Sequence, residues 1–253
     1  MKKRGQITIF ILVAIIILVV GILIYFLYPK INGDVSVTEN PSLFMQSCVE
    51  DTLKDNVAEI SMQGGSISPE HYILYKGDKI EYLCYTNEYY KKCVMQQPLL
   101  KKHIENEIKS SIDTVVYSCL DDLKKSYSKK GYEVSLTQGD FSVELFPKKI
   151  KLRINKTLTL KKQDTKIYNS LNVVLNNNLY ELVSIAQNIL NWEAHYGDAE
   201  TTIYMTYYRN IKVEKKKQSD GSTIYILTDR NTGDKFQFAS RSIAWPPGYA
   251  NVQ

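Results

Sequence analysis

One uninterrupted apolar stretch near the N-terminus stands apart from the mixed apolar and polar pattern of the remaining chain. Residues 7–28 hold no charged side chain and consist mostly of Ile, Leu, Val and Phe. As an α-helix, these 22 residues would rise about 33 Å, which matches the hydrocarbon thickness of a bilayer. The pattern predicts a transmembrane helix at 7–28, after a leader at 1–6 and before a tether at 29–40.

Three later segments carry apolar residues at helical spacing. The first begins with Asn40 as N-cap and Pro41 at the first helical position, and it extends to about residue 60. The second covers about 99–128 and ends before Gly131, and the third covers about 178–194. Their apolar stripes are Met45, Cys48, Val49, Leu53, Val57 and Ile60; Ile104, Ile108, Ile112, Val115, Cys119, Leu120 and Leu123; and Leu179, Leu182, Val183, Ile185, Ala186, Ile189 and Leu190. Each stripe predicts a helix with one buried side.

Short runs of β-branched and aromatic residues, several of them alternating with polar residues, predict strands. The expected strands are 72–75 and 79–85, then 132–136, 141–146, 150–160 and 167–175, and finally 202–216, 223–228 and 236–240. Because most of them follow one another without an intervening helix, we expect antiparallel pairing. The predicted fold class is therefore α+β, with one N-terminal transmembrane helix and an extracytoplasmic domain of helices packed on antiparallel sheet.

The predicted elements differ between the two halves of the exterior part. Residues 41–130 form a helical region with short strands and all four cysteines, and residues 131–253 form a β-rich region with one helix. No Pro-rich or Gly-rich linker separates the two regions. We therefore expect 41–253 to be one continuous extracytoplasmic unit.

The charges beside the apolar stretch predict its orientation in the cell membrane. Lys2, Lys3 and Arg4 precede it, whereas Lys30 alone follows it, so the positive-inside rule keeps the N-terminus in the cytoplasm. A cleavable secretory signal would have a shorter apolar core followed by small residues. Bulky residues follow here, so we expect a retained single-pass anchor whose first partner is the lipid bilayer.

Most of the basic excess lies in this leader. The net charge is +5, but three of the 32 basic residues precede the apolar stretch, and the other 29 nearly balance 27 acidic residues. Such a balance does not indicate a nucleic-acid-binding surface, and we expect no nucleic acid as a partner.

The four cysteines all fall in the predicted exterior region. An even number of cysteines outside the cytoplasm is typical of disulfides, and four cysteines allow three pairings. Packing the first two helices along their stripes would join Cys48 to Cys119, while Cys84 and Cys93 would close a local loop. Free buried thiols and a metal site are the alternatives, although the spacing lacks the C-x-x-C pairs of a structural zinc site. We expect two disulfides and no metal.

The first residues add a resemblance to this topology. The stretch Lys3 to Phe10 (KRGQITIF), directly before the apolar helix, resembles the class III, type IV pilin-like signal peptides of archaeal surface proteins. The resemblance implies cleavage between Gly5 and Gln6 by a pilin-type peptidase, with the apolar helix retained. The family places a Glu at the fifth mature position, where this chain has Phe10. That departure leaves anchoring intact and makes polymerisation into a filament an open question.

A second resemblance covers much of the chain. The KRGQ start, a Ser-Cys helix, a Gln-Gly-Gly turn at Gln63 and a Gly-Tyr-Glu strand start at Gly131 are similar to uncharacterised membrane-anchored proteins of small-genome archaea. No activity is known for that group, so this resemblance supports the architecture alone.

No familiar catalytic motif is present. The sequence lacks the phosphate-binding glycine loops, the H-E-x-x-H zinc motif and the G-x-S-x-G nucleophile turn. The segment from Trp192 to Glu200 offers acids and His195, which could serve acid-base chemistry if the fold brought them together. A solvated helix end is the simpler interpretation of this segment. His71 and His103 offer no better pattern, and we expect no cofactor and no catalytic residue.

Two surface features remain as candidate sites. The residues between Cys84 and Cys93 include Tyr85, Tyr89 and Tyr90, which would form an aromatic recognition loop or a merely structural one. Asn155 begins an N-x-[ST] glycosylation acceptor.

Together the patterns predict a pilin-like or structural component of the cell surface that binds its own copies or other surface proteins. The alternatives are a monomeric anchored binding or adhesion module, and an extracytoplasmic hydrolase without a recognisable motif.

Overall fold

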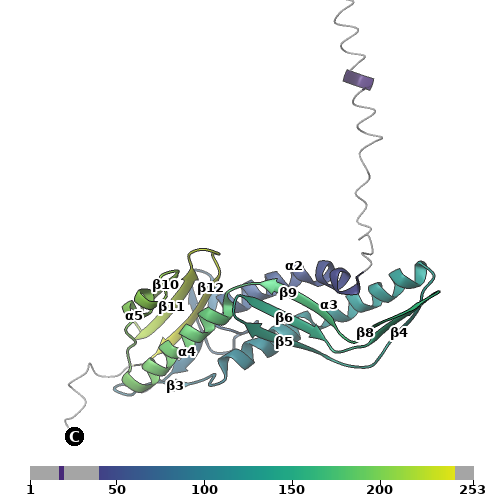
Figure 1. Cartoon of the computed structure of the whole chain (residues 1–253). Coiled ribbons are helices and arrows are strands. Elements are labelled where there is room, and N and C mark those ends of the chain that lie inside the picture. The colour runs from purple at the N-terminus through teal and green to yellow at the C-terminus, as the bar shows by residue number, and fades with distance from the viewer. Residues whose placement is uncertain (1–16, 20–39, 243–253) are drawn as a thin grey trace, which may run out of the picture. The chain divides into compact units, whose positions relative to one another are not determined.

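The computed structural model describes residues 17–19 and 40–242 (Figure 1). The chain divides into the units Met1–Ser36 and Val37–Gln253, and the second holds all the elements below. Among the residues described, no helix is both long and apolar enough to traverse a bilayer. The predicted span at 7–28, of which only 17–19 are described and helical, lies otherwise outside them, as do Gly5 and Gln6.

Four helices lie in the second unit, in the part that is described: α2 (Pro41–Met62), α3 (Leu100–Lys129), α4 (Leu179–Tyr196) and α5 (Thr202–Tyr207). The Asn40 side chain begins α2 by accepting a hydrogen bond from the Ser42 backbone N–H at 2.9 Å, as its N-cap role predicts. Gly197 ends α4 in the left-handed conformation that favours glycine. Local sequence signals therefore determine where α2 begins and where α4 ends.

The strands form three sheets. The largest has the order β1-β2-β12-β11-β10, with β3 paired to β2, and the two smaller sheets have the orders β5-β6-β9 and β4-β7-β8. The strands are β1 (Tyr72–Tyr75), β2 (Asp78–Tyr85), β3 (Val94–Met95), β4 (Glu133–Leu136), β5 (Phe141–Phe146), β6 (Lys149–Ile154), β7 (Leu158–Lys161), β8 (Thr165–Tyr168), β9 (Leu171–Asn176), β10 (Ile211–Lys217), β11 (Ser222–Asp229) and β12 (Lys235–Arg241). The fold class is α+β with mainly antiparallel sheets, as predicted.

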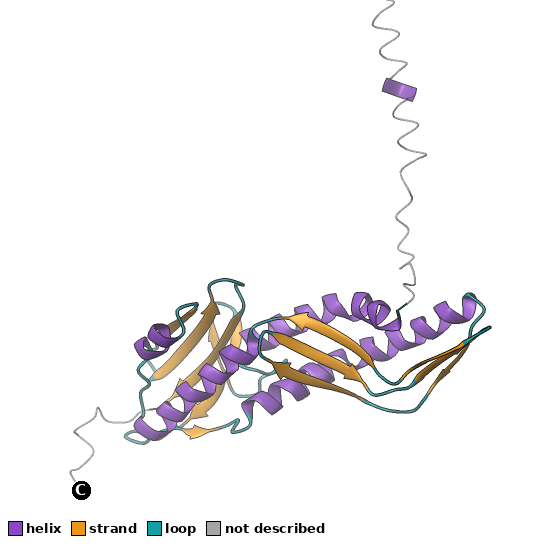
Figure 2. Cartoon of the chain, viewed as in Figure 1, coloured by secondary structure: helices purple, strands orange, loops and turns teal. Residues whose placement is uncertain are grey.

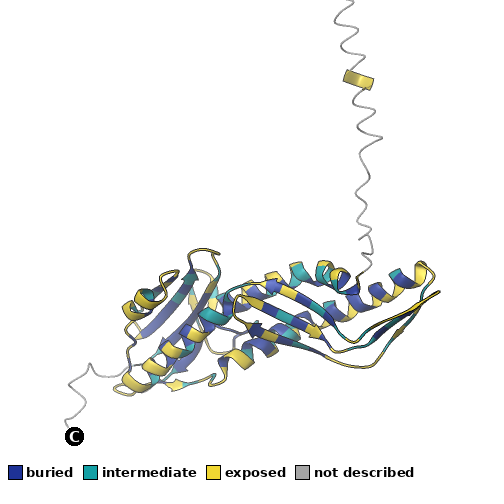
Figure 3. Cartoon of the chain, viewed as in Figure 1, coloured by how far each residue is buried: buried dark blue, intermediate teal, exposed yellow. Residues whose placement is uncertain are grey.

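Helices cover one face of the largest sheet and one face of the β5-β6-β9 sheet. α2 and α3 pack together, with α2 against β9 and α3 against β5, and α4 contacts β12, β11 and β2 as well as β5 and β6 (Figure 2). The strand faces beneath the helices are buried, whereas the outer helix faces are exposed (Figure 3). One hydrophobic core runs through all of these contacts, and a smaller cluster around Ile80, Tyr82, Ile224 and Ala239 lies apart from it.

Two disulfides join these elements. Cys48 of α2 bonds to Cys119 of α3, with Cα atoms 6.0 Å apart. Cys84 of β2 bonds to Cys93, just before β3, with Cα atoms 5.3 Å apart. These are the same two pairs that the helical stripes and the local loop suggest, and the described residues include no free cysteine.

Two of the predicted strands are wrong as single elements. Residues 150–160 divide into β6 and β7, which belong to different sheets, and residues 167–175 divide into β8 and β9 in the same way. The buried positions keep the same phase from Ile150 to Leu160, although the chain passes from one sheet to the other at Asn155–Thr157. A two-residue period reports which face is buried but not which sheet supplies the neighbours.

The region around residue 202 also differs from the prediction. Residues 202–216 were expected to be one strand, but α5 occupies Thr202–Tyr207 before β10 begins. The Glu200 carboxylate accepts hydrogen bonds from the Thr202 backbone N–H at 2.8 Å and from its hydroxyl at 2.5 Å, which stabilises the first turn of α5. The β-branched and aromatic composition gave no sign of this cap.

Two strand pairings were not foreseen. β3 is a short added edge strand, and β12 pairs with β2 in parallel, with a register shift between Ala239 and Ser240. The expectation of antiparallel pairing holds for the other ladders in the described part of the chain. β2 and β12 are far apart in sequence, so no local signal specifies their relative direction.

Candidate functional site

A pocket of about 320 Å³ near the N-terminal end of α3 is lined by several ionisable side chains. We call it the polar pocket. Its lining residues are Ser66, Ser68, Pro69, Glu70, His71, Glu81, Tyr82, Gln96, Gln97, His103 and Glu107. They come from the loop after α2, from β2, from the connection after β3 and from α3.

The loop after α2 brings Ser66 into this pocket. Gly64 and Gly65 have φ angles of +87° and +109°, and the Gly65 backbone N–H bonds to the Ile60 carbonyl at 2.9 Å, which ends α2. A Cβ atom on Gly64 would lie 2.8 Å from the Glu81 Cβ. Glycine is therefore required here both for the backbone conformation and for the close approach to β2.

Ser66 lies between an acid and an imidazole. Its hydroxyl is 2.5 Å from Oε2 of Glu81, to which it donates, and 2.8 Å from Nε2 of His103. Burial raises the pKa of the Glu81 carboxyl above its ordinary value of 4.5, while the hydrogen bond from Ser66 and the nearby His103 act in the opposite direction. The three groups form a hydrogen-bonded chain that runs from the Glu81 carboxyl through the Ser66 hydroxyl to the His103 imidazole.

The contacts of Ser66 differ from those of a serine that is activated by a histidine. A hydroxyl has one hydrogen, so when Ser66 donates to Glu81 it cannot also donate to His103, which then donates from Nε2. A nucleophilic serine gives its proton to the base that activates it, and with this donation that base would be Glu81 rather than His103. Ser66 is 6% exposed, so a substrate would have little access to its hydroxyl.

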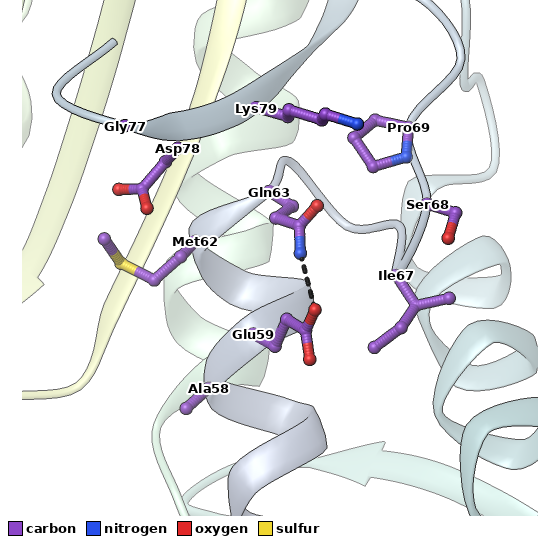
Figure 4. A pocket seen from close by; sticks show the side chains of 10 residues that line it. All are labelled: Ala58, Glu59, Met62, Gln63, Ile67, Ser68, Pro69, Gly77, Asp78 and Lys79. Atoms are coloured by element: carbon purple, nitrogen blue, oxygen red, sulfur yellow. Dashed lines mark hydrogen bonds between the residues drawn. The ribbon is translucent and has the colours of Figure 1, made fainter. Parts of the chain in front are cut away.

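A second, more open pocket of about 670 Å³ adjoins the polar pocket and shares Ser68 and Pro69 with it. Figure 4 shows it between the last turn of α2, the loop that carries Ile67, and the turn before β2. Within it the Gln63 amide donates to the Glu59 carboxylate at 3.0 Å. Its charged side chains, Glu59, Asp78 and Lys79, do not converge on one point (Figure 4), so this pocket offers volume but no arrangement of groups for catalysis.

The sequence segment 192–200 is not brought together as an acid-base site. Glu193 is 2% exposed and accepts hydrogen bonds from the Tyr225 hydroxyl, from the Ser240 hydroxyl at 2.9 Å and from the Ala199 backbone N–H at 3.0 Å. His195 is exposed and donates from Nδ1 to the Asn191 carbonyl of its own helix at 2.8 Å.

The interpretation as a solvated helix end is therefore wrong for Glu193 and fits His195. Burial raises the pKa of the Glu193 carboxyl, and burial beside Glu193 raises the pKa of the Tyr225 hydroxyl. None of the larger described pockets is lined by Glu193. Its hydrogen bonds tie α4 to the largest sheet, which is a structural role.

The two other histidines are also placed differently from each other. His103, which the sequence leaves on a charged helix face, points to Ser66, whereas His71 packs its ring against Tyr82 and Tyr85, at centroid distances of 4.8 and 4.2 Å. The four-residue spacing of His103 and Glu107 on one helix face is the one sequence signal that could have indicated a shared site. Ser66 and Glu81 carried no such signal.

The disulfide loop presents part of the predicted recognition surface. Tyr89 and Tyr90 are 70% and 62% exposed, with ring centroids 6.4 Å apart. Tyr85 ends β2 and packs between His71, Tyr82 and the Arg241 guanidinium rather than at the loop tip. Asn155 is exposed between β6 and β7, and its glycosylation stays a prediction.

Neither a metal centre nor a relative identifies the site. No group of three or more His, Cys, Asp or Glu side chains in the described ranges could hold a metal ion. Comparison of the chain with protein-family models, with curated proteins and with solved structures found no match. The resemblance to archaeal class III signal peptides therefore stays a prediction.

Proposed function

We propose that this chain is a single-pass, membrane-anchored protein of the cell surface, whose folded part lies outside and acts as a pilin-like structural or interaction component. The observation that carries the proposal is the pair of disulfides, Cys48–Cys119 and Cys84–Cys93. Disulfides persist in oxidising compartments and are rare in the cytosol. The charge-free stretch at 7–28 supplies the means to hold a folded domain at the outer face of a membrane.

The location is tested on intact cells that express the full chain. A membrane-impermeant amine reagent should label lysines of the folded part, such as Lys54 and Lys166 on the exposed surface, and carbonate washing should leave the protein in the membrane fraction. A cytosolic protein of the same cells serves as the unlabelled control. Labelling only after lysis, or release by carbonate, contradicts the proposed location.

The anchored protein could be a cleaved, pilin-like component or an uncleaved binding module, and the mature N-terminus distinguishes the two. Mass spectrometry of the membrane fraction should find a mature chain that begins at Gln6, and a Gly5→Leu variant should keep Met1 or residue 2 at its terminus. Sedimentation of the mature protein as a filament supports the pilin-like form. A Met1 terminus with monomers alone supports the anchored binding module instead.

The hydrolase alternative depends on Ser66, because its hydroxyl lies 2.5 Å from the Glu81 carboxylate. If Glu81 acted as general base, a fluorophosphonate probe would attach to Ser66, and the Ser66→Ala variant would not react. We expect no labelling, because Ser66 is buried and no catalytic motif surrounds it. Stoichiometric labelling that Ser66→Ala abolishes would establish the enzyme.

A further inference from the structure

An aromatic groove lies between α4 and α5. It has a volume of about 400 Å³ and is lined by Tyr180, Glu181, Ser184, Ile185, Asn188, Ile203, Tyr204, Tyr207 and Tyr208. Tyr207, Ile203 and Tyr208 are 79%, 51% and 51% exposed. Glu181 is the one charged side chain in this lining, and its carboxylate already accepts a hydrogen bond from the Lys148 backbone N–H at 3.0 Å. The groove therefore presents tyrosine rings and aliphatic surface with little free charge.

A row of residues on α4 continues from the groove toward the end of that helix. Tyr180, Ser184, Asn188, Trp192 and Tyr196 follow one another at four-residue spacing, so each is a surface neighbour of the next. Trp192 and Tyr196 are 44% and 60% exposed, with ring centroids 4.7 Å apart. Aromatic rings thus lie at both ends of this row on α4, with the polar side chains of Ser184 and Asn188 between them.

The described chain ends beside this last turn. The Ser242 hydroxyl accepts a hydrogen bond from the Cys93 backbone N–H at 3.1 Å and donates to the Glu193 carbonyl at 3.4 Å. Pro247 is five residues beyond Ser242, and five residues can span up to about 17 Å. Along α4, Ser184 is nine residues from Glu193, or about 14 Å. The groove is therefore within reach of the C-terminal segment of the same chain.

The composition of that segment suits the groove. Residues 243–253 (IAWPPGYANVQ) contain Trp245, Pro246 and Pro247 and no charged side chain. Adjacent prolines favour the polyproline II conformation, which docks on aromatic-lined grooves at low entropic cost. A lining of tyrosines with one already bonded carboxylate matches an uncharged, proline-containing strand.

We propose that the groove between α4 and α5 is a polyproline-type docking site whose occupant is the chain's own segment Trp245–Pro247. The exposed rings of Trp192 and Tyr196 guide this segment along α4 from Ser242. Docking in this way covers apolar surface that a monomer would otherwise expose to water.

The two tryptophans of the chain, Trp192 and Trp245, make the proposal measurable. In the full chain in detergent, the Trp192→Phe variant leaves Trp245 as the only tryptophan. We expect its emission to be shifted to shorter wavelength, and acrylamide to quench it several-fold less than in the same variant unfolded by denaturant. Adding Tyr207→Ser should remove this protection, because Tyr207 lines the groove and is largely exposed. Replacing both Pro246 and Pro247 by serine should do the same.

A matched control removes a tyrosine that lies elsewhere and is about as exposed as Tyr207. Tyr89→Ser, in the Trp192→Phe background, should leave the protection of Trp245 unchanged, because Tyr89 lies on the disulfide loop. Quenching equal to that of the unfolded chain overturns the proposal. Protection that persists with Tyr207→Ser also overturns it and assigns Trp245 to the micelle or to another surface. Protection that disappears on dilution replaces the same-chain occupant by the segment of a second copy.

Discussion

At the scale of single residues, the buried carboxylate of Glu193 accepts hydrogen bonds from three donors in three parts of the chain. Tyr225 and Ser240 belong to neighbouring strands of the largest sheet, and Ala199 follows α4. A carboxylate in such a site depends on these donors, since burial without them would cost far more than the hydrogen bonds contribute. Its removal should therefore affect stability rather than a reaction.

The first prediction concerns this carboxylate. Glu193→Ala should lower the free energy of unfolding by several kcal/mol, since each buried donor that loses its acceptor costs roughly 1–3 kcal/mol. Glu193→Gln keeps the volume and one acceptor oxygen and should cost less. Equilibrium denaturation of the full chain in detergent measures both variants. Equal stability of the Ala variant and the native chain would contradict the structural role.

The same residue gives a pH dependence. Because the folded-state pKa of Glu193 lies above the ordinary value of 4.5, its contribution to stability is fully present below pH 4.5 and is lost as the pH rises through the folded pKa. The native chain should therefore lose stability relative to Glu193→Gln between pH 4.5 and neutrality. Parallel stability curves for the two proteins over that range would refute the assignment.

Gly64 offers a test of local backbone geometry. Gly64→Ala must hold a side chain at φ +87° and place Cβ 2.8 Å from the Glu81 Cβ, whereas Gly77→Ala has φ +99° and no atom within 4 Å. Gly77→Ala should cost about 1–2 kcal/mol for the conformation alone. Gly64→Ala should cost clearly more, and thermal unfolding compares the two. If the two variants unfold at the same temperature, the close approach of the loop to β2 is not tight.

At the scale of elements, the disulfides differ in what they constrain. Cys48–Cys119 spans 71 residues and fastens α2 to α3, whereas Cys84–Cys93 spans 9 residues at a sheet edge. In the chain-entropy model, replacing both cysteines of a pair by alanine costs roughly 4 kcal/mol for the long loop and roughly 2.5 kcal/mol for the short one. Denaturation of the two double variants should show that order, and the reverse order would mean that native-state packing outweighs loop closure.

Helices were more predictable than strands for a physical reason. The stripes through Val49 and Ile108 repeat over many turns, so each helix could be read from its own residues. The stretch around Asn155 kept an alternating pattern while passing between two sheets, and the pairing of β2 with β12 joins distant segments. Helical hydrogen bonds are local, whereas strand partners are chosen by the rest of the fold.

At the scale of the whole molecule, the second unit has its own core, and the predicted anchor precedes it. A chain that begins at Val37 should therefore leave the membrane pellet and appear in the supernatant, with both disulfides formed. High-speed centrifugation and mass spectrometry without reduction measure this, with the full chain as control. Truncated protein that still sediments with membranes would point to a second membrane contact.

The candidate site was only partly visible in the sequence. The spacing of His103 and Glu107 could be read from one helix, but Ser66 and Glu81 lie on a loop and a strand that only packing brings to them. Conversely, Glu193 and His195 are close in sequence and face opposite environments, because residues two apart on a helix point in different directions. Sequence proximity was therefore a poor guide to the site.

The sequence by itself determined the features that depend on neighbours along the chain: the helical stripes that hold Cys48 and Cys119, the caps at Asn40 and Gly197, and a stretch long and apolar enough to predict an anchor. Only the tertiary structure decided which strands share a sheet, that Glu193 is buried, and that Ser66 lies between Glu81 and His103. Those properties arise from contacts between segments far apart in sequence, which form only when the core closes around them.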